Sequence, residues 1–361
     1  MLASTCKGSG FMIGIDIGTS NCKLAIGSGG AMELIAARMP ENAIRSGANE
    51  GEVVSPETMA QFLKQLRAEA HIRERDCALV LPAAQVYFRY LTMPPMNITE
   101  LTLNLPYEFR DYITGDPEEY TYDYAVDEIT RDDSGAVVKM ELYAAAVPKS
   151  VVETYSAMLR RAGFKLKMVT PAPMAYMRLI RTYNEQHPEA ADKDVVLVDL
   201  GHSGVSISMY RGHRYDSMRT IDIGCSELDR TIADIKGIDP YTASNYKLTN
   251  FEGVLDDPDC MAIYDHFAVE VSKVVNFYNF NNPEREIGQL FFLGGGARIP
   301  YLTNAISEAV SVPTSVIDPL LPPAARGQEN TTVCALAVAA LWKGSRSRWR
   351  WTGAKRFLFR A

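Results

Sequence analysis

Residues 12–27, MIGIDIGTSNCKLAIG, consist of two apolar runs on either side of a polar corner. Ile13, Ile15 and Ile17 alternate with other residues before the corner, and the alternation resumes at Leu24. A period of two predicts β-strands, so we expect a strand, a tight corner and a second strand. A Rossmann or Walker phosphate loop is excluded, because both open a helix and no Gly-Lys-Ser/Thr is present.

The same pattern returns in residues 194–210, DVVLVDLGHSGVSISMY. An apolar run again ends in Asp-x-Gly, here from Asp199 to Gly201, before a corner of small residues and an alternating second strand. A duplicated hairpin predicts two similar lobes facing one cleft. A third glycine element lies in residues 289–306, QLFFLGGGARIPYLTNAI, where we expect a strand, a break at residues 294–296 and a helix from near Pro300.

Together these three elements predict a nucleotide site, although one Asp-x-Gly corner alone is usually only a turn. Backbone N–H groups of Gly18, Thr19 and Ser20 can hold a phosphate, and those of residues 201–204 can do the same. Residues 294–296 carry no side chain, which lets the main chain lie flat against an adenosine.

The two acidic residues of the corners predict a metal ion. Asp16 and Asp199 would meet across the phosphates, where two carboxylates repel unless they hold a cation. Mg²⁺ suits this place because it keeps most of its waters and takes few protein ligands.

Composition sets the class of protein. With 361 residues the chain is too long for one ordinary core, and its formal net charge of −7 argues against nucleic acid as a partner. Six cysteines without a Cys-x-x-Cys predict reduced, mostly core thiols in a cytosolic compartment. We expect neither a signal peptide nor a membrane span, since the longest apolar run, residues 332–342, is about half of the roughly 20 residues required.

Residues 343–361, KGSRSRWRWTGAKRFLFRA, contain basic and aromatic residues and no acidic one. This composition is typical of a segment that lies on an anionic membrane surface, and equally of a solvated tail. Both interpretations stay open.

Residues 86–148 are expected to form a small α+β insert: a strand, a helix from near Ile98 that Pro106 interrupts, and two strands around a turn. On either side of it we expect helices, one capped by Ser55 and one that opens with a Ser150–Glu153 capping box.

The order IGIDIGTSNCKLAIG, VVLVDLGHSGVSISMY, FFLGGGARIP resembles the phosphate-1, phosphate-2 and adenosine motifs of the superfamily of actin, heat-shock chaperones and sugar kinases. Within it the chain is similar to the PilM family of type IV pilus assembly proteins, relatives of the cell-division protein FtsA. The segments LTMPPMNITELTLNLPYEFRDYI, AAVPKSVVETYSAMLRRAGFKLKMVTPAPMA, GIDPYTASNYK and VEVSKVVNFYNF carry this narrower resemblance, which covers about residues 12–342.

The resemblance implies an α/β, actin-like (ribonuclease H-like) two-lobed fold with the extra α+β subdomain of FtsA and PilM. It places residues 12–85 and 149–190 in the first lobe, 86–148 in the insert, 191–342 in the second lobe and 343–361 in a tail. It further implies a cytoplasmic scaffold, peripheral at the inner face of the membrane, that binds ATP, Mg²⁺, the N-terminal peptide of a PilN-like inner-membrane protein, and other components of a pilus machine. Whether the protein forms a homo-oligomer stays open.

The resemblance also implies the site residues, and it assigns no catalytic one. Asp16 and Asp199 would hold the metal through water. Lys23 either points at a phosphate or is solvated, and Arg298 either flanks the adenine or lies on the surface. The residues expected to bind nucleotide are Asp16, Gly18, Thr19, Ser20, Asn21, Lys23, Asp199, Gly201, His202, Ser203, Gly224, Lys247, Gly294, Gly295, Gly296 and Arg298.

Departures from the family pattern predict binding with poor hydrolysis. Cys225 and Ser244 stand where relatives often have Gly and Glu, and the second corner lacks its usual threonine. Residues 171–174, PAPM, offer no polar side chain to orient an attacking water, and water positioning is a large part of phosphoryl-transfer catalysis. Two alternatives are an FtsA-like membrane tether and a small-molecule kinase, for which the general-base carboxylate is not found.

Overall fold

The computed structural model describes residues 12–28, 30–41, 43–45 and 52–341. These residues form two compact units, the first of residues up to 175 together with 336–341, the second of residues 176–335. The basic tail at 343–361 lies outside the described residues. Within the described part, no helix combines the length and the apolar character that crossing a bilayer requires.

The first unit is built on a five-stranded sheet of order β3-β2-β1-β4-β8. The hairpin predicted from residues 12–27 is present as β1 (Met12–Ile17) and β2 (Asn21–Ser28), which pair antiparallel. Ile13 and Ile15 are fully buried, as the alternation predicts. The remaining strands are β3 (Ala31–Arg38), β4 (Asp76–Leu81) and β8 (Lys165–Pro171), of which β4 runs parallel to both β1 and β8.

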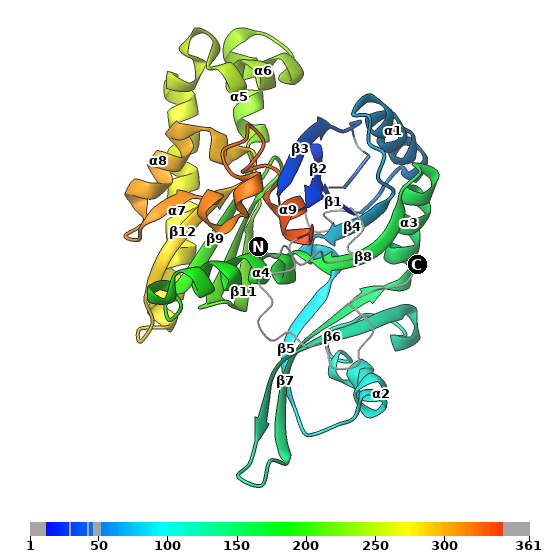
Figure 1. The fold of residues 1–361 in the computed structure, drawn as a ribbon. Coiled ribbons are helices and arrows are strands. Elements are labelled where there is room, and N and C mark those ends of the chain that lie inside the picture. The colour runs from blue at the N-terminus through cyan, green and yellow to red at the C-terminus, as the bar shows by residue number, and fades with distance from the viewer. Residues whose placement is uncertain (1–11, 29, 42, 46–51, 342–361) are drawn as a thin grey trace, which may run out of the picture. The chain divides into compact units, whose positions relative to one another are not determined.

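Helices α1 (Pro56–Glu69) and α3 (Lys149–Arg161) lie side by side in this unit (Figure 1). α9 (Ala335–Leu341) returns from the second unit to pack against β1. The approach is close, because a Cβ on Gly14 would lie 2.0 Å from the Ala337 carbonyl oxygen. Only glycine fits at this point of β1.

Both predicted side-chain caps are wrong. Ser55 stands at the N-cap of α1, but its Oγ is 2.9 Å from the Thr58 Oγ1 and makes no capping hydrogen bond to the backbone. α3 begins at Lys149, with Pro148 at the N-cap, so Ser150 is already inside the helix and cannot cap it.

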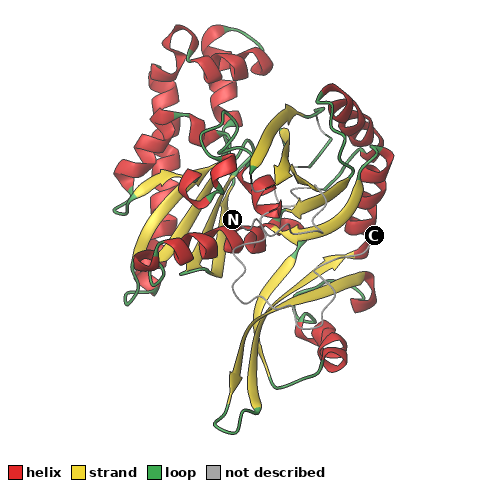
Figure 2. Cartoon of the chain, in the orientation of Figure 1, coloured by secondary structure: helices red, strands yellow, loops and turns green. Residues whose placement is uncertain are grey.

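The insert is a three-stranded sheet of order β5-β7-β6 with one helix beside it (Figure 2). Its elements are β5 (Tyr87–Met93), α2 (Ile98–Glu108), β6 (Tyr120–Arg131) and β7 (Val137–Pro148). Pro106 lies inside α2, and the helix ends two residues later, at Glu108. Tyr120 and Tyr124 are buried in the core between α2 and the sheet.

The second unit repeats the strand order of the first. Its sheet runs β11-β10-β9-β12-β13, with an antiparallel meander followed by two parallel strands. The strands are β9 (Asp194–Leu200), β10 (Val205–Arg211), β11 (Arg214–Ile221), β12 (Ile287–Leu293) and β13 (Thr314–Val316). Each sheet thus places its third, second, first, fourth and fifth strands side by side, which is the duplication that the two Asp-x-Gly hairpins predict.

The helices of this unit are α5 (Ser226–Lys236), α6 (Pro240–Thr249), α7 (Pro258–Asn281) and α8 (Pro300–Ala309). Most of α4 (Ala172–Gln186) belongs here as well, although the sequence places residues up to 190 in the first lobe. The Tyr183 ring of α4 lies edge-on to Phe291 of β12 at 6.0 Å, which explains the difference.

Five described cysteines, Cys22, Cys77, Cys225, Cys260 and Cys334, are free and buried, in agreement with the predicted core thiols.

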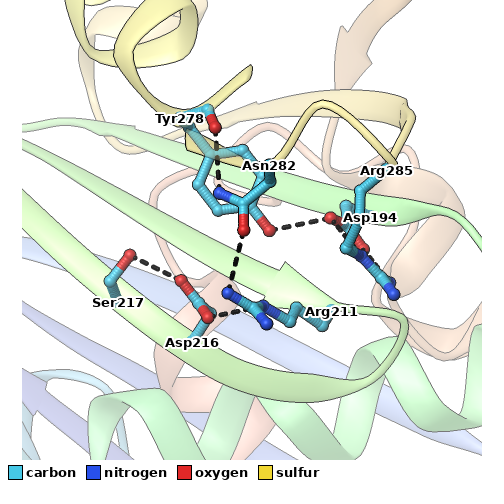
Figure 3. A network of polar contacts seen from close by, with 7 residues as sticks. All are labelled: Asp194, Arg211, Asp216, Ser217, Tyr278, Asn282 and Arg285. Carbon is cyan, nitrogen blue, oxygen red and sulfur yellow. Dashed lines mark hydrogen bonds and ion pairs between the residues drawn. The ribbon is translucent and has the colours of Figure 1, made fainter. Parts of the chain in front are cut away.

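A buried ion pair fixes the start of β9 (Figure 3). Asp194 is 1% exposed, and its carboxylate accepts hydrogen bonds from the Tyr278 hydroxyl at 2.7 Å and from the Arg285 guanidinium, whose Nε is 2.9 Å from both oxygens. Nearby, Arg211 donates to the Asn282 side chain at 3.0 Å and pairs with Asp216 at 2.6 Å. The network ties β9, β10 and β11 to the C-terminal end of α7.

We predict that Arg285→Met lowers the free energy of unfolding by about 3 kcal/mol, since it leaves a buried carboxylate without its cation. Lys193→Met is the matched control, because it breaks the neighbouring Lys193–Glu286 pair, whose side chains are 43% and 69% exposed, and should cost less than about 1 kcal/mol. Urea denaturation followed by circular dichroism measures both. Equal losses in the two variants would contradict the assigned role of Arg285.

Candidate functional site

The first corner is closed by its own backbone. The Gly18 N–H donates to the Asn21 carbonyl at 3.1 Å, and the Ser20 carbonyl accepts from the Met39 N–H at 2.9 Å. The second corner closes in the same way, because the Gly201 N–H donates to the Gly204 carbonyl at 3.1 Å. The two corners therefore match in a hydrogen bond as well as in sequence.

This closure changes which donors are available for an anion. The N–H groups of Gly18 and Gly201 were expected to face a phosphate, but both are used inside their corners. Phosphate donors at these corners would therefore come from the residues that follow each glycine. Thr19, Ser20 and Ser203 are half-buried there, and His202 is exposed.

Asp16 and Lys23 form an ion pair across the first corner. Lys23 Nζ is 2.9 Å from Asp16 Oδ2, and the two side chains are 20% and 13% exposed. The lysine crosses the corner so closely that a Cβ on Gly18 would lie 2.7 Å from its Nζ. Lys23 thus lies at the corner itself.

A phenol lies close to the same carboxylate. Burial raises the pKa of Tyr155, and the negative charge of Asp16 raises it further. The Tyr155 hydroxyl therefore stays protonated near Asp16 at neutral pH.

In the second unit, three glycines let separate segments meet at the second corner. A Cβ on Gly224 would lie 2.2 Å from the His202 carbonyl oxygen, and one on Gly294 would lie 2.4 Å from Asp199 Oδ1. Gly296 is in similar contact with Leu200 and Cys225. The second corner, Gly224 and the glycine triplet, which the sequence leaves far apart, are therefore brought together. β12 achieves this because Leu293 pairs with Asp199 at the end of β9.

The start of helix α5 is hydrogen-bonded to the second corner. The N–H groups of Cys225 and Ser226 donate to the carbonyls of Gly201 and His202 at 3.0 and 2.9 Å. These bonds satisfy donors at the helix start and hold the corner in place. Burial raises the pKa of the Cys225 thiol to about 11, so it remains a neutral packing group.

Lys247 is buried and contacts the start of α5, which is hydrogen-bonded to the second corner. It is 8% exposed, and its Nζ is 2.6 Å from Asp229 Oδ1 and 3.2 Å from the Cys225 carbonyl oxygen. Asp229 also lies 3.7 Å from His202 Nδ1. The sequence gives no partner for His202 and does not single out Asp229. The pattern that could have identified Asp229 is an acidic residue among the buried, mostly apolar positions of α5.

Three further residues belong to the predicted set: Arg298 and Gly295 in the second unit, and Asn21 in the first. Arg298 is on the surface, 3.5 Å from Glu329, and nothing lies within 4 Å of a Cβ built on Gly295. Asn21 contributes its carbonyl to the first corner, and its amide is 3.5 Å from the Ser20 hydroxyl.

The solved structures that resemble the chain include two that match it over more than nine tenths of its length. One, described as "PilM-PilN type IV pilus biogenesis complex", is 21% identical with a TM-score of 0.71, over 91% of this chain and 98% of that one. The other is the ethanolamine utilization protein EutJ from Carboxydothermus hydrogenoformans, 14% identical with a TM-score of 0.54, over 94% of this chain and 92% of that one.

The repeated sheets, the Asp-x-Gly corner in each and these two likenesses define an actin-like ATPase fold. The sequence model of the family "Type IV pilus assembly protein PilM" matches residues 14–332. The chain belongs to this family of pilus assembly proteins.

We predict that Gly224→Ala disorders the second corner and costs about 1–3 kcal/mol of unfolding free energy, because the new methyl group would overlap backbone atoms of residues 202–204. Gly295→Ala is the control: its φ is −67°, the space around it is open, and the change should stay within about 0.5 kcal/mol. Thermal and urea unfolding measure both. Similar stability of the two variants would show that the contact at Gly224 is not tight.

Proposed function

We propose that the protein is a scaffold of a type IV pilus machine that binds Mg-ATP at its two corners and a peptide of an inner-membrane partner at its insert. The observation that carries the nucleotide part is the matched pair of corners, each with an acidic residue before a glycine whose N–H closes the turn. Family membership supports the pilus part.

The corners supply the chemistry that a polyphosphate needs. Thr19 and Ser20 lie inside the closed turn of the first corner, and His202 and Ser203 lie inside that of the second. Asp16 and Asp199 would hold a hydrated Mg²⁺ through its waters, and the ion would offset the negative charge of the phosphates. The Lys23 ammonium, 2.9 Å from the Asp16 carboxylate, can exchange this ion pair for one with a phosphate.

We predict that Asp16→Ala and Asp199→Ala each abolish Mg-ATP binding in calorimetry. The circular dichroism spectrum should stay that of the folded protein, because each aspartate lies next to the last residue of its strand and is only half-buried. Asp76→Ala is the control: this acid starts β4, and its pair with Lys167 is 3.6 Å long and exposed. Unchanged affinity in both corner variants would overturn the nucleotide site.

The partner part of the proposal concerns the insert. The solved structure that resembles the chain over 98% of its own length is a complex of PilM with PilN, and we propose that the N-terminal peptide of a PilN-like protein binds this chain. Large apolar side chains are exposed on the insert, as a peptide-binding surface requires: Tyr90, Ile98, Leu103, Tyr107, Tyr112, Ile129 and Val138. Such a partner would hold the protein at the inner face of the membrane.

We predict that a fluorescent N-terminal peptide of the neighbouring inner-membrane pilus protein binds the chain and that Leu103→Glu weakens it at least about tenfold by placing a charge on the apolar surface. Leu103 is 67% exposed, and Leu248→Glu, at a leucine 58% exposed in the second unit, is the matched control. Fluorescence anisotropy gives the affinities. Equal binding of a scrambled peptide would contradict the partner.

A further inference from the structure

A basic pocket lies at the C-terminal end of α1, away from the corners. It measures about 450 Å³ and is lined by Lys64, Arg67, Ala68, His71, Ile72 and Arg73. Its lining contains no acidic residue, in a chain whose formal net charge is −7. Among the described residues, none forms an ion pair with Lys64, Arg67 or Arg73.

Arg67 is held in place and left with an unused donor. Its guanidinium lies over the Phe164 ring at 5.7 Å, and a Cβ on Gly163 would lie 3.0 Å from its Nη1. Its Nε is buried and has no hydrogen-bond partner within the described residues. A buried N–H without an acceptor is costly, and the guanidinium of Arg67, which lines the pocket, carries further N–H groups that can donate to an anion there.

The helix end accounts for part of this cluster only. A cation in the last turn interacts favourably with the helix dipole, which explains the position of Arg67. It does not explain Arg73, which lies beyond the helix. The φ of 51° at His71 belongs to the helix end itself, where the chain turns through a left-handed residue and the Ile72 N–H donates to the Arg67 carbonyl at 3.0 Å. The acids adjacent in sequence, Glu69 and Glu74, do not line the pocket, and Glu69 accepts a hydrogen bond from Gln65 at 2.7 Å.

The sheet separates this pocket from the first corner. β1 and β4 are parallel, with Ile13 beside Cys77 and Asp16 beside Val80. The first corner follows the end of β1, whereas the pocket precedes the start of β4. The pocket and the first corner therefore lie at opposite ends of the parallel strands β1 and β4, so the pocket is not a part of the proposed nucleotide site.

We propose that this pocket binds a phosphate group, with Arg67 as its fixed donor and Lys64 and Arg73 as the cations around it. A phosphate offers several acceptor oxygens and a full negative charge, which match a guanidinium fork and adjacent cations. Both a soluble phosphate compound and the headgroup of an anionic phospholipid present this chemistry.

The experiment uses the full chain with ¹³C-labelled histidine, since the protein has five histidines and His71 lines the pocket. Sodium pyrophosphate is titrated against sodium chloride of equal ionic strength, and the His71 NMR signal is identified with His71→Gln. We expect a saturable shift of that signal. The His202 signal, from the second corner, reports the nucleotide site separately, so failure of one proposal is distinguishable from failure of the other.

Arg67→Met, which keeps the packing on Phe164, and Arg73→Glu should each weaken the His71 response at least about tenfold, the effect of one lost charged hydrogen bond. Lys149→Glu, at an exposed lysine of the same unit, is the matched control and should change nothing. A second arm replaces pyrophosphate by phosphatidylcholine vesicles with and without phosphatidylglycerol; a response to these alone assigns the phosphate to a lipid. The proposal is overturned if neither probe gives a His71 response that depends on Arg67 and Arg73.

Discussion

The structure depends on one hydrogen bond made twice, from a corner glycine N–H to the carbonyl three residues later, at Gly18 and at Gly201. It turns the chain back so that the second strand pairs antiparallel with the first. The other edge of the first strand is then left for a parallel neighbour, β4 in one sheet and β12 in the other. The same constraint places an acidic residue and the side chains after the glycine at the C-terminal end of the central strand of each sheet.

Much of this fold could be predicted from the sequence, because local alternation is enough to identify strands that are buried on one or both faces. Strands β3 and β11 could not be predicted, since their residues are mostly half-exposed and they are strands because β2 and β10 offer them a partner edge. The caps failed for a related reason. Whether Ser150 caps α3 depends on where β7 ends, and β7 continues to Pro148.

The candidate site could be predicted in its backbone and not in its side-chain pairing. Glycines mark places where segments meet, and Gly224 and Gly294 do meet the second corner. The pairing of Asp229 with Lys247 joins two helices, and only the packed unit brings the two residues together. Lys23 shows the same limit, because its reach to Asp16 follows from the register of β1 and β2, which pairs these two residues.

Binding and turnover of a nucleotide make different demands on such a fold. Holding a polyphosphate takes donors, cations and a metal, which corner residues supply, whereas hydrolysis also needs a side chain that orients water. In the segment 171–174, Pro171, Pro173 and Met174 are buried and apolar, and the preceding Thr170 is fully buried. If Mg-ATP binds, its effect on the pilus machine would therefore come from occupancy of the site. A partner would then bind the nucleotide-bound and the nucleotide-free form with different affinities.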